Sequence, residues 1–292
     1  MKAPKIVSEI GCNHKGSLEI AKEMVKVTAE FVGADYVKFQ KRTNKELLSD
    51  EEYSTPHPNP KNSYGATYGE HREFLEFSLE QHEELKHFCE KLKIGYATSV
   101  WDFTSAKEIA ALKPDFIKIP SACNLNFALI DYLISGYSGD IHVSLGMTNR
   151  TEEKRILDRF DEYGALDRLV LYACTSGYPV PHKDVCLLEI TRFNEIYKKR
   201  VKAIGFSGHH LGIAIDVAAQ TLGAEWIERH FTLDRTWKGT DHAASLEPDG
   251  FRRLVRDSKA VAKSLAEKPQ EILEIEKPQR AKLKRFSEAL SD

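Results

Sequence analysis

The chain has 292 residues, of which 41% are hydrophobic, and its 42 lysine and arginine residues nearly balance 44 aspartate and glutamate residues. This balance argues against a protein built to coat nucleic acid or an anionic membrane, because either partner would select a positive excess. No apolar run approaches the about 20 residues that cross a bilayer. The first residues, MKAPKIVSEIGCNH, lack the apolar core and cleavage site of a secretion signal. The five cysteines form no CxxC pair, so we expect reduced thiols in a cytoplasmic protein with neither a membrane nor a nucleic-acid partner.

Short apolar runs alternate with amphipathic stretches along the chain. The expected strands cover residues 5–11, 34–40, 94–100, 116–121, 141–147, 169–175, 203–208 and 225–232. The expected helices cover residues 17–33, 81–92, 103–112, 125–135, 151–163, 187–199, 213–222 and 248–265. This alternation predicts an α/β fold, a (β/α)8 TIM barrel that forms a single domain over residues 1–265. A doubly wound open sheet is the alternative, but no GxGxxG turn follows the first strand.

Two segments interrupt the alternation. Residues 41–80 carry Pro56, Pro58, Pro60, Gly65 and Gly69 among polar residues. We expect a long loop after the second strand, which in a barrel would lie over the active site. Residues 266–292 are highly charged, so this tail is expected to be either a solvated terminus or a docked helix.

Polar residues gather at the predicted carboxyl ends of the strands, where barrel enzymes carry their chemistry. Inward-facing Lys38 and Lys118 would each cost several kcal/mol unless they met an anion, so they indicate an anionic ligand. Serines recur at these ends, namely Ser99, Ser121, Ser144, Ser176 and Ser207. Hydroxyl and ammonium groups that converge on one point form a phosphate or carboxylate site.

Two histidines end adjacent strands, His209 in GFSGHHLG and His230 in WIERHFT. Neighbouring strands lie about 5 Å apart, so both imidazoles could reach one cation. Such an open pair suits a catalytic ion, Mn²⁺ or Mg²⁺ with Co²⁺ as a further candidate, better than a closed structural zinc. Cys12 is a candidate third ligand, although a small buried thiol is the commoner role. His210 has no assigned role and is expected to face solvent or the helix after Gly212.

The same residues carry a family resemblance. The segments SEIGCNHKGSLEIAKEM, ADYVKFQ, IKIPSA, VSLGM, YACTSGYPVP, GFSGHHLG, WIERHFTLDR and GTDHAASLEP occur in this order. Together they resemble the catalytic barrel of the N-acetylneuraminate (sialic acid) synthase family over about residues 5–265. The resemblance implies a transferase that condenses phosphoenolpyruvate with an open-chain aldose, most readily an N-acetylmannosamine-like sugar. The products would be a 3-deoxy-2-keto sugar acid of the sialic acid type and phosphate, with a metal that polarises the aldehyde.

The resemblance also implies roles for individual residues. Lys38 and Ser99 match positions toward the phosphoenolpyruvate carboxylate, and Lys118, Ser121, Ser144, Ser176 and Ser207 match positions toward its phosphate. Glu9 matches an acid/base carboxylate, and His209 and His230 match the metal ligands. The sugar-contacting positions correspond to Gln40, Tyr178 and Asp241, whereas His14 would either orient the site or cap the first helix. A homodimer is expected on the same grounds.

The chain departs from the family pattern at three places. Many members have a glutamate that helps hold the sugar where this chain has Cys123, and a thiol cannot accept two hydroxyl hydrogen bonds as a carboxylate does. Many have an asparagine and a bulky residue before the tyrosine where this chain has Ser176, Gly177 and Tyr178. Many also carry a C-terminal antifreeze-like domain that supplies an arginine to the sugar's acyl group. We expect the barrel without that domain and its arginine, with either a sugar that lacks an N-acetyl group or a lid formed by residues 41–80.

Three alternatives remain at this point. The same chemistry could act on a non-acetylated pentose or hexose and give an octulosonate-type or deaminated nonulosonate-type product. A Schiff-base aldolase could use Lys38 or Lys118. A binding protein that has lost activity would lack ligands that are present here.

Overall fold

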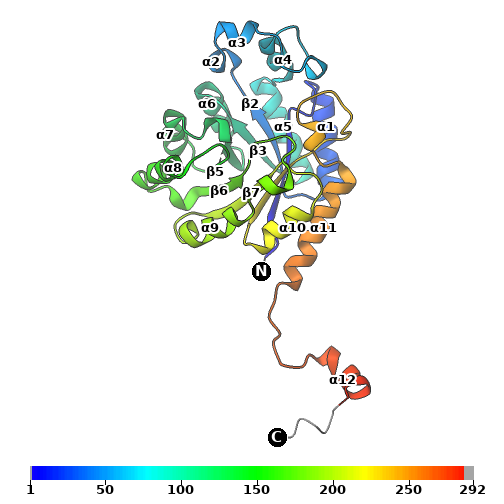
Figure 1. Ribbon diagram of the computed structural model, residues 1–292. Helices are drawn as coiled ribbons and strands as arrows, with labels where there is room; N and C mark the ends of the chain where they lie inside the picture. The colour runs from blue at the N-terminus through cyan, green and yellow to red at the C-terminus, as the bar shows by residue number, and fades with distance from the viewer. Residues whose placement is uncertain (1, 286–292) are drawn as a thin grey trace.

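Eight parallel strands pair in chain order from β1 to β8 and close into a barrel in the computed structural model, which describes residues 2–285 (Figure 1). The strands are β1 Lys5–Gly11, β2 Tyr36–Lys41, β3 Gly95–Val100, β4 Phe116–Ile119, β5 Asp140–Ser144, β6 Leu169–Cys174, β7 Ala203–Gly208 and β8 Trp226–His230. The predicted TIM barrel is confirmed, and the open doubly wound sheet is excluded by the pairing of β8 with β1.

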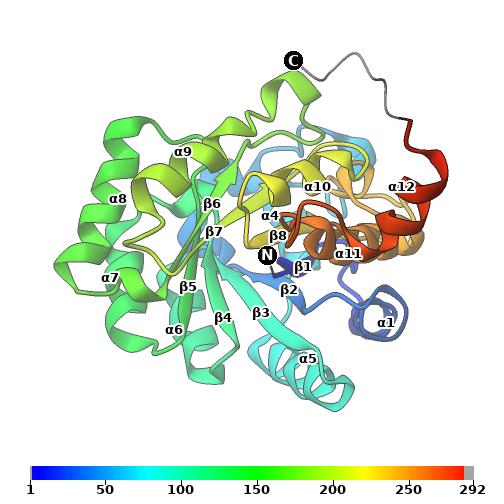
Figure 2. The same ribbon diagram turned by 90° about the horizontal axis from the view of Figure 1, so that it is seen from below.

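A ring of helices covers the outside of the barrel, as the view along its axis shows (Figure 2). The ring contains α1 Leu18–Val27, α5 Leu79–Leu92, α6 Phe103–Leu112, α7 Phe127–Gly136, α8 Arg150–Glu162, α9 Leu188–Tyr197, α10 Ala214–Thr221 and α11 Pro248–Ser264. Ser17 caps α1 by accepting a hydrogen bond from the Ile20 backbone N–H at 3.3 Å. The first helix continues as a π-helical turn and stops at Gly33, whose φ of 74° suits a residue without a Cβ.

Aromatic rings fill the amino-terminal half of the barrel interior. Alternation along each strand points Tyr36, Phe116, Tyr172 and Trp226 inward together with His142. The Phe116 and His142 rings stack with centroids 3.8 Å apart, and Trp226 meets both rings edge-on. This layer forms a floor, so the inward positions one step further along the strands face the open end of the barrel.

Residues 42–76, here called the lid, stand on the carboxyl ends of the strands (Figure 1). The predicted long loop is wrong in one respect, because the segment contains α2 Asn44–Leu47, α3 Asp50–Ser54 and α4 Tyr68–Leu75. Reciprocal capping boxes start α3 at Ser49 and Glu52 and α4 at Thr67 and Glu70. Each box satisfies backbone N–H groups that a short helix leaves unpaired, which explains why so polar a segment is ordered.

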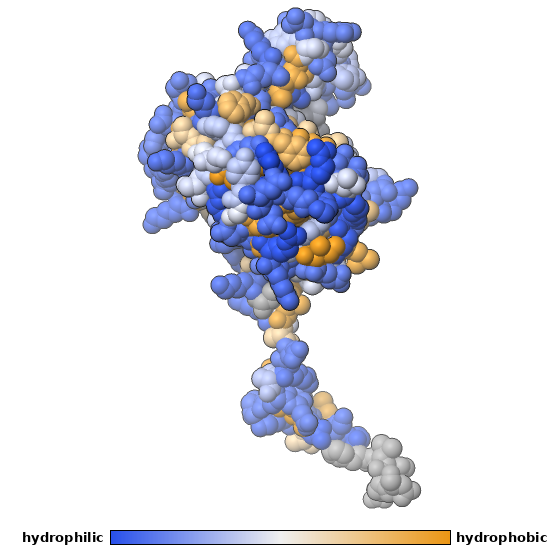
Figure 3. Space-filling view, turned by 90° about the vertical axis from the view of Figure 1, so that its left-hand side faces the viewer, coloured by the Kyte–Doolittle hydropathy of each residue, from blue (hydrophilic) through white to orange (hydrophobic). Residues whose placement is uncertain are grey.

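Residues 266–285 extend away from the barrel, on the side opposite the lid (Figures 1 and 3). They contain one helical turn, Glu274–Glu276, and the short helix α12 Lys277–Leu283, neither of which has a buried residue. The docked-helix alternative is therefore wrong for residues 266–285, and the remainder of the predicted tail, 286–292, lies outside the described residues. Over the part of the chain that the structure describes, no helix is long and apolar enough to cross a membrane.

Candidate active site

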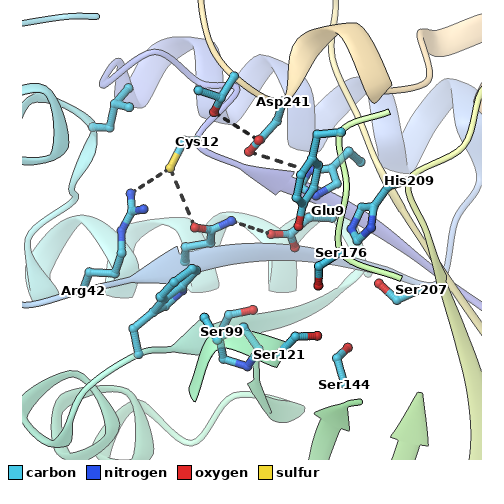
Figure 4. Close-up of a pocket in the computed structure, with 18 of the residues that line it drawn as sticks. Glu9, Cys12, Arg42, Ser99, Ser121, Ser144, Ser176, Ser207, His209 and Asp241 are labelled. Atoms are coloured by element: carbon cyan, nitrogen blue, oxygen red, sulfur yellow. Dashed lines mark hydrogen bonds and ion pairs between the residues drawn. The ribbon is translucent and has the colours of Figure 1, made fainter. Parts of the chain in front are cut away.

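A cavity of about 670 Å³ opens at the carboxyl ends of the strands, beneath the lid (Figure 4). Its lining includes Glu9, Cys12, Lys38, Gln40, Ser99, Lys118, Ser121, Ser144, Ser176, Tyr178, Ser207, His209, His230 and Asp241. All the predicted site residues except His14 and Cys123 thus share one cavity. The lid also contributes, as expected for a segment over the site, through Arg42, His57, Tyr68, His71 and Arg72.

Two lysines and two glutamates form a buried charge network at the bottom of the cavity. Lys38 on β2 forms an ion pair with Glu9 on β1 and donates a hydrogen bond to Ser99 Oγ at 2.6 Å. Lys118 on β4 reaches across the barrel to Glu228 on β8, with 2.5 Å between Nζ and Oε1, while the second oxygen of Glu228 lies 3.8 Å from Lys38. These carboxylates supply the anions that the two lysines need. Contrary to the prediction, the two lysines therefore do not by themselves require an anionic ligand.

The two glutamates titrate in opposite directions. Burial raises the pKa of Glu9 to about 7, against the attraction of Lys38, and the negative charge of Glu228 adds to the rise. Burial acts the same way on Glu228, but Lys118 and Lys38 outweigh it and lower its pKa to about 2. One carboxyl group therefore stays ionised while the other can exchange a proton near neutral pH, which is the division of roles expected of an acid/base site.

The serine hydroxyls lie beside this network. Ser144 Oγ is buried and has no hydrogen-bond partner among the described residues. Ser121 Oγ accepts a hydrogen bond from the Gly146 backbone N–H at 3.0 Å. A Cβ on Gly146 would lie 2.5 Å from Ser176 Oγ and 2.7 Å from Ser121 Oγ. A glycine at this position therefore keeps the hydroxyls close together, and the unpaired Ser144 can still bond to an oxygen-rich ligand.

The imidazoles of His209 and His230 lie higher in the cavity, with ring centroids 5.5 Å apart. His209 Nδ1 lies 2.9 Å from the carbonyl oxygen of Thr175, so Nδ1 carries the proton and leaves the Nε2 lone pair free. His230 Nδ1 is buried without a hydrogen-bond partner in the described chain. Burial lowers the pKa of each ring to about 3, which keeps both neutral, the form that binds metals. This pair fits a cation that takes its other ligands from water and substrate.

The arrangement gives no support to Cys12 as a third ligand. Within residues 2–285 no group of three histidine, cysteine, aspartate or glutamate side chains is placed to hold a metal ion. Cys12 Sγ instead accepts a hydrogen bond from Arg42 Nη2 at 2.9 Å, and burial raises the pKa of its thiol to about 12.

The predicted sugar-contacting side chains surround the histidines. Gln40 Nε2 donates a hydrogen bond to Glu9 Oε1 at 3.2 Å, which links it to the charge network. Asp241 Oδ2 lies 4.0 Å from His230 Nδ1, and the Tyr178 ring lies 4.3 Å from the His209 ring. Their positions agree with the prediction, and their roles stay predictions.

Three residues lie elsewhere. His14 is buried against Phe77, with ring centroids 4.0 Å apart, and its Nδ1 accepts the Gly16 backbone N–H just before α1. Cys123 is also buried and its thiol donates to the Trp101 carbonyl oxygen at 3.2 Å, so the predicted contacts of both residues with the substrate have no support in this arrangement. For His210 the solvent alternative is wrong. It is fully buried, and its Nε2 lies 3.3 Å from Asp216 of α10, which confirms the helix alternative.

Several cavity residues are not among the residues predicted from the sequence. One is Glu228, although it stands two positions before His230 and therefore on the same inward face of the strand. Arg42, His71 and Arg72 belong to a segment that was expected to be loop. The capping boxes were readable signals for helices there, but they do not say which side chains of those helices reach the cavity.

Known proteins resemble this chain over most of its length. Residues 24–270 match the NeuB family. The human N-acetylneuraminate-9-phosphate synthase is 36% identical over 271 residues, which are 93% of this chain and 74% of that protein. The N,N'-diacetyllegionaminic acid synthase of Campylobacter jejuni is 32% identical over 91% of this chain and 79% of its own. A crystal structure of the N-acetylneuraminic acid (sialic acid) synthetase of Leptospira borgpetersenii with citrate has a TM-score of 0.81 at 25% identity and covers 98% of this chain and 94% of its own.

Proposed function

The chain belongs to the NeuB family and is an enzyme that condenses phosphoenolpyruvate with a sugar, and from that premise we propose that the sugar is an N-acetylmannosamine-like amino sugar in its open-chain form. The products are a nonulosonate and inorganic phosphate. The observation that carries the proposal is the arrangement of the cavity. Ser99, Ser121 and Ser144 lie on one side, Glu9 and His209 lie in the middle, and Asp241 lies on the other side (Figure 4). The two buried lysines and the second histidine line the same cavity.

Phosphoenolpyruvate binds at the bottom in this proposal. Lys38 and Ser99 hold its carboxylate, because they already lie within hydrogen-bond distance of each other. Lys118 and the hydroxyls of Ser121, Ser144, Ser176 and Ser207 hold its phosphate. The free hydroxyl of Ser144 gains a partner when phosphate oxygens arrive, and Lys118 can turn from Glu228 to the ligand without moving across the barrel.

The bond changes follow from this placement. Carbon 3 of phosphoenolpyruvate attacks the aldehyde carbon and forms the new C–C bond, while the aldehyde oxygen takes up a proton. Water adds to carbon 2 and releases a proton. The C–O bond to phosphate then breaks, and the new hydroxyl group gives its remaining proton to the departing phosphate as the ketone forms. Glu9, with a pKa of about 7, is placed to take one proton and return the other, since it is buried between Lys38 and Gln40. The carboxylate of Glu228 pairs with Lys118 and lies 3.8 Å from Lys38.

His209 and His230 would hold a divalent cation, Mn²⁺ or Mg²⁺ with Co²⁺ as a further candidate. When bound, the cation would act as a Lewis acid on the carbonyl group of the sugar. The Thr175 carbonyl fixes the tautomer of His209, and Asp241 stands near His230 to orient the sugar.

Phosphate release from phosphoenolpyruvate tests the proposal. The purified protein with Mn²⁺ is offered a panel of aldoses that includes N-acetylmannosamine, mannose and arabinose, each free and phosphorylated, and the product is identified by mass spectrometry. The proposal requires stoichiometric phosphate and nonulosonate with the amino sugar. Phosphate release with arabinose alone would assign the octulosonate-type alternative. A borohydride-trapped adduct on Lys38 or Lys118 would instead establish the Schiff-base mechanism.

A further inference from the structure

Arg72 is a cation at the cavity wall with no acidic partner. It lies on α4 of the lid, half-buried, with its guanidinium carbon 4.9 Å from the Tyr68 ring centre and 5.7 Å from that of Trp101. Across the described chain no hydrogen bond or ion pair to a carboxylate engages it. Arg42 beside the same cavity differs, because Glu76 and the Cys12 thiol already occupy its guanidinium. Arg72 therefore keeps its five donors available for a ligand.

His71 supplies a second donor next to Arg72. Its Nδ1 accepts the Tyr64 backbone N–H at 3.1 Å, so the neutral ring carries its proton on Nε2. Burial, together with the nearby His57, Arg42 and Arg72, lowers the pKa of His71 to about 4, which keeps the ring neutral. Nε2 makes no hydrogen bond to any described residue. No aspartate or glutamate of the lid lines the cavity, so this wall carries no negative charge of its own.

The position of Arg72 and His71 in the cavity determines which part of the sugar they can contact. The aldehyde end of the sugar belongs beside His209 in the proposed function, and Figure 4 shows Arg42 and Cys12 on the opposite side of the cavity from His209. The far end of an open-chain sugar therefore points toward the lid. Phosphoenolpyruvate contributes three carbons, so carbon 6 of a hexose becomes carbon 9 of the product. The name of the human relative places a phosphate on that carbon, whereas the name of the Campylobacter jejuni relative gives no phosphate.

We propose that Arg72, assisted by His71, binds a phosphoryl group on the terminal carbon of the sugar, so that this enzyme prefers a 6-phosphorylated hexose. This inference rests on the proposed function and names the substrate class of the same site. A planar guanidinium with a neighbouring neutral N–H donor matches the geometry of a phosphate monoester, and no hydrogen bond or ion pair to a carboxylate of the described chain competes for that guanidinium. Arg72 is on this view a specificity residue that does not touch the reacting carbons.

Two matched sugar pairs separate a phosphoryl contact from an acyl contact. The condensation is measured with N-acetylmannosamine, mannose and the 6-phosphate of each, for the wild type and for Arg72→Met. We expect the wild type to favour both phosphates, and Arg72→Met to lose about 10- to 100-fold in kcat/KM on the phosphates only, as for one charge-assisted contact. Arg252→Met is the control, because Arg252 also stands over an aromatic ring, at 4.8 Å from Phe31, but lies on α11 outside the cavity.

Calorimetric titration of N-acetylmannosamine 6-phosphate into each variant, with phosphoenolpyruvate and chelator present, needs no turnover. Weaker binding of the sugar phosphate to Arg72→Met than to the wild type and Arg252→Met supports the inference, even if no sugar is condensed. The absence of condensation would by itself overturn only the proposed function. A wild type without preference for the phosphates overturns the inference. A loss of kcat/KM in Arg72→Met with both acetylated sugars, phosphorylated or not, also overturns the inference. That result would assign Arg72 to the acyl carbonyl.

Discussion

Replacing Lys118 by methionine leaves Glu228 without its closest cation at the bottom of the cavity. Lys118 Nζ lies 2.5 Å from Glu228 Oε1, and the remaining cation, Lys38, lies 3.8 Å from the other oxygen and also serves Glu9. Removing one partner of a buried pair costs about 3–5 kcal/mol of unfolding free energy. Because Lys38 compensates in part, we expect the lower end, about 3 kcal/mol. That loss corresponds to a fall in Tm of roughly 6–12 °C for a large domain.

The same substitution removes a proposed phosphate contact, so the KM for phosphoenolpyruvate should rise about 10- to 100-fold. A second substitution separates the two effects. In Lys118→Met/Glu228→Gln the unpaired carboxylate is gone, so most of the lost Tm should return while the high KM remains. Calorimetric melting and initial rates of phosphate release measure the two quantities on the same preparations.

Lys154→Met is the matched control, since Lys154 lies 2.5 Å from Asp158 in an exposed pair on α8. Exposed pairs contribute about 0–1 kcal/mol, so this variant should melt close to the wild type. The reasoning fails if Lys118→Met melts with the wild type, or if the double variant is no more stable than the single one. An unchanged KM for phosphoenolpyruvate would refute the phosphate pocket.

Three other predictions test separate parts of the site. Chelation, His209→Ala or His230→Ala should each abolish turnover, and full activity after rigorous metal removal would exclude the metal role. Glu9, with its folded pKa raised to about 7, keeps its proton where the unfolded state has already lost it, so its contribution to stability is present below pH 4.5 and is lost as the pH rises to 7. The unfolding free energy of the wild type should therefore fall relative to that of Glu9→Gln over this range. The pH profile of kcat/KM should also change slope near pH 7 in the wild type but not in Glu9→Gln. Parallel pH profiles of the two proteins would contradict the assignment. Iodoacetamide at pH 8 should label exposed Cys186 first and Cys12 very slowly, because burial raises the pKa of Cys12 to about 12. Mass spectrometry of digests after timed quenching measures the order of labelling, and labelling of Cys12 before Cys186 would contradict this prediction.

The fold and the polar residues of the barrel could be predicted because strands obey a period of two. Once the strands were placed, Lys38, Lys118 and His230 had to point inward at their carboxyl ends, and the predicted strand bounds agree with the observed ones to within three residues. The partners of these residues could not be predicted in the same way. Lys118 and Glu228 lie 110 positions apart and meet across the barrel, and only closure of the sheet brings β4 and β8 face to face.

The lid was hidden for a different reason. Its short helices carry no sustained apolar period, and their order depends on capping boxes and on packing over the barrel. His14 and Cys123 show the converse error, because residues next to a strand end turn into the helix layer as easily as into the cavity.

The charge network and the lid divide the work of recognition between them. At the bottom, each lysine has a carboxylate partner before any ligand arrives, so the site is held in place without substrate and an incoming anion must compete with Glu9 and Glu228. That competition favours a ligand with several negative oxygens over one with a single carboxylate. At the lid, Arg72 rests on two aromatic rings and makes no hydrogen bond or ion pair to a carboxylate of the described chain, so one anionic group meets less competition there. The chemistry is therefore built into the strands of the barrel, whereas the choice of sugar depends on a segment that the strand pattern does not constrain.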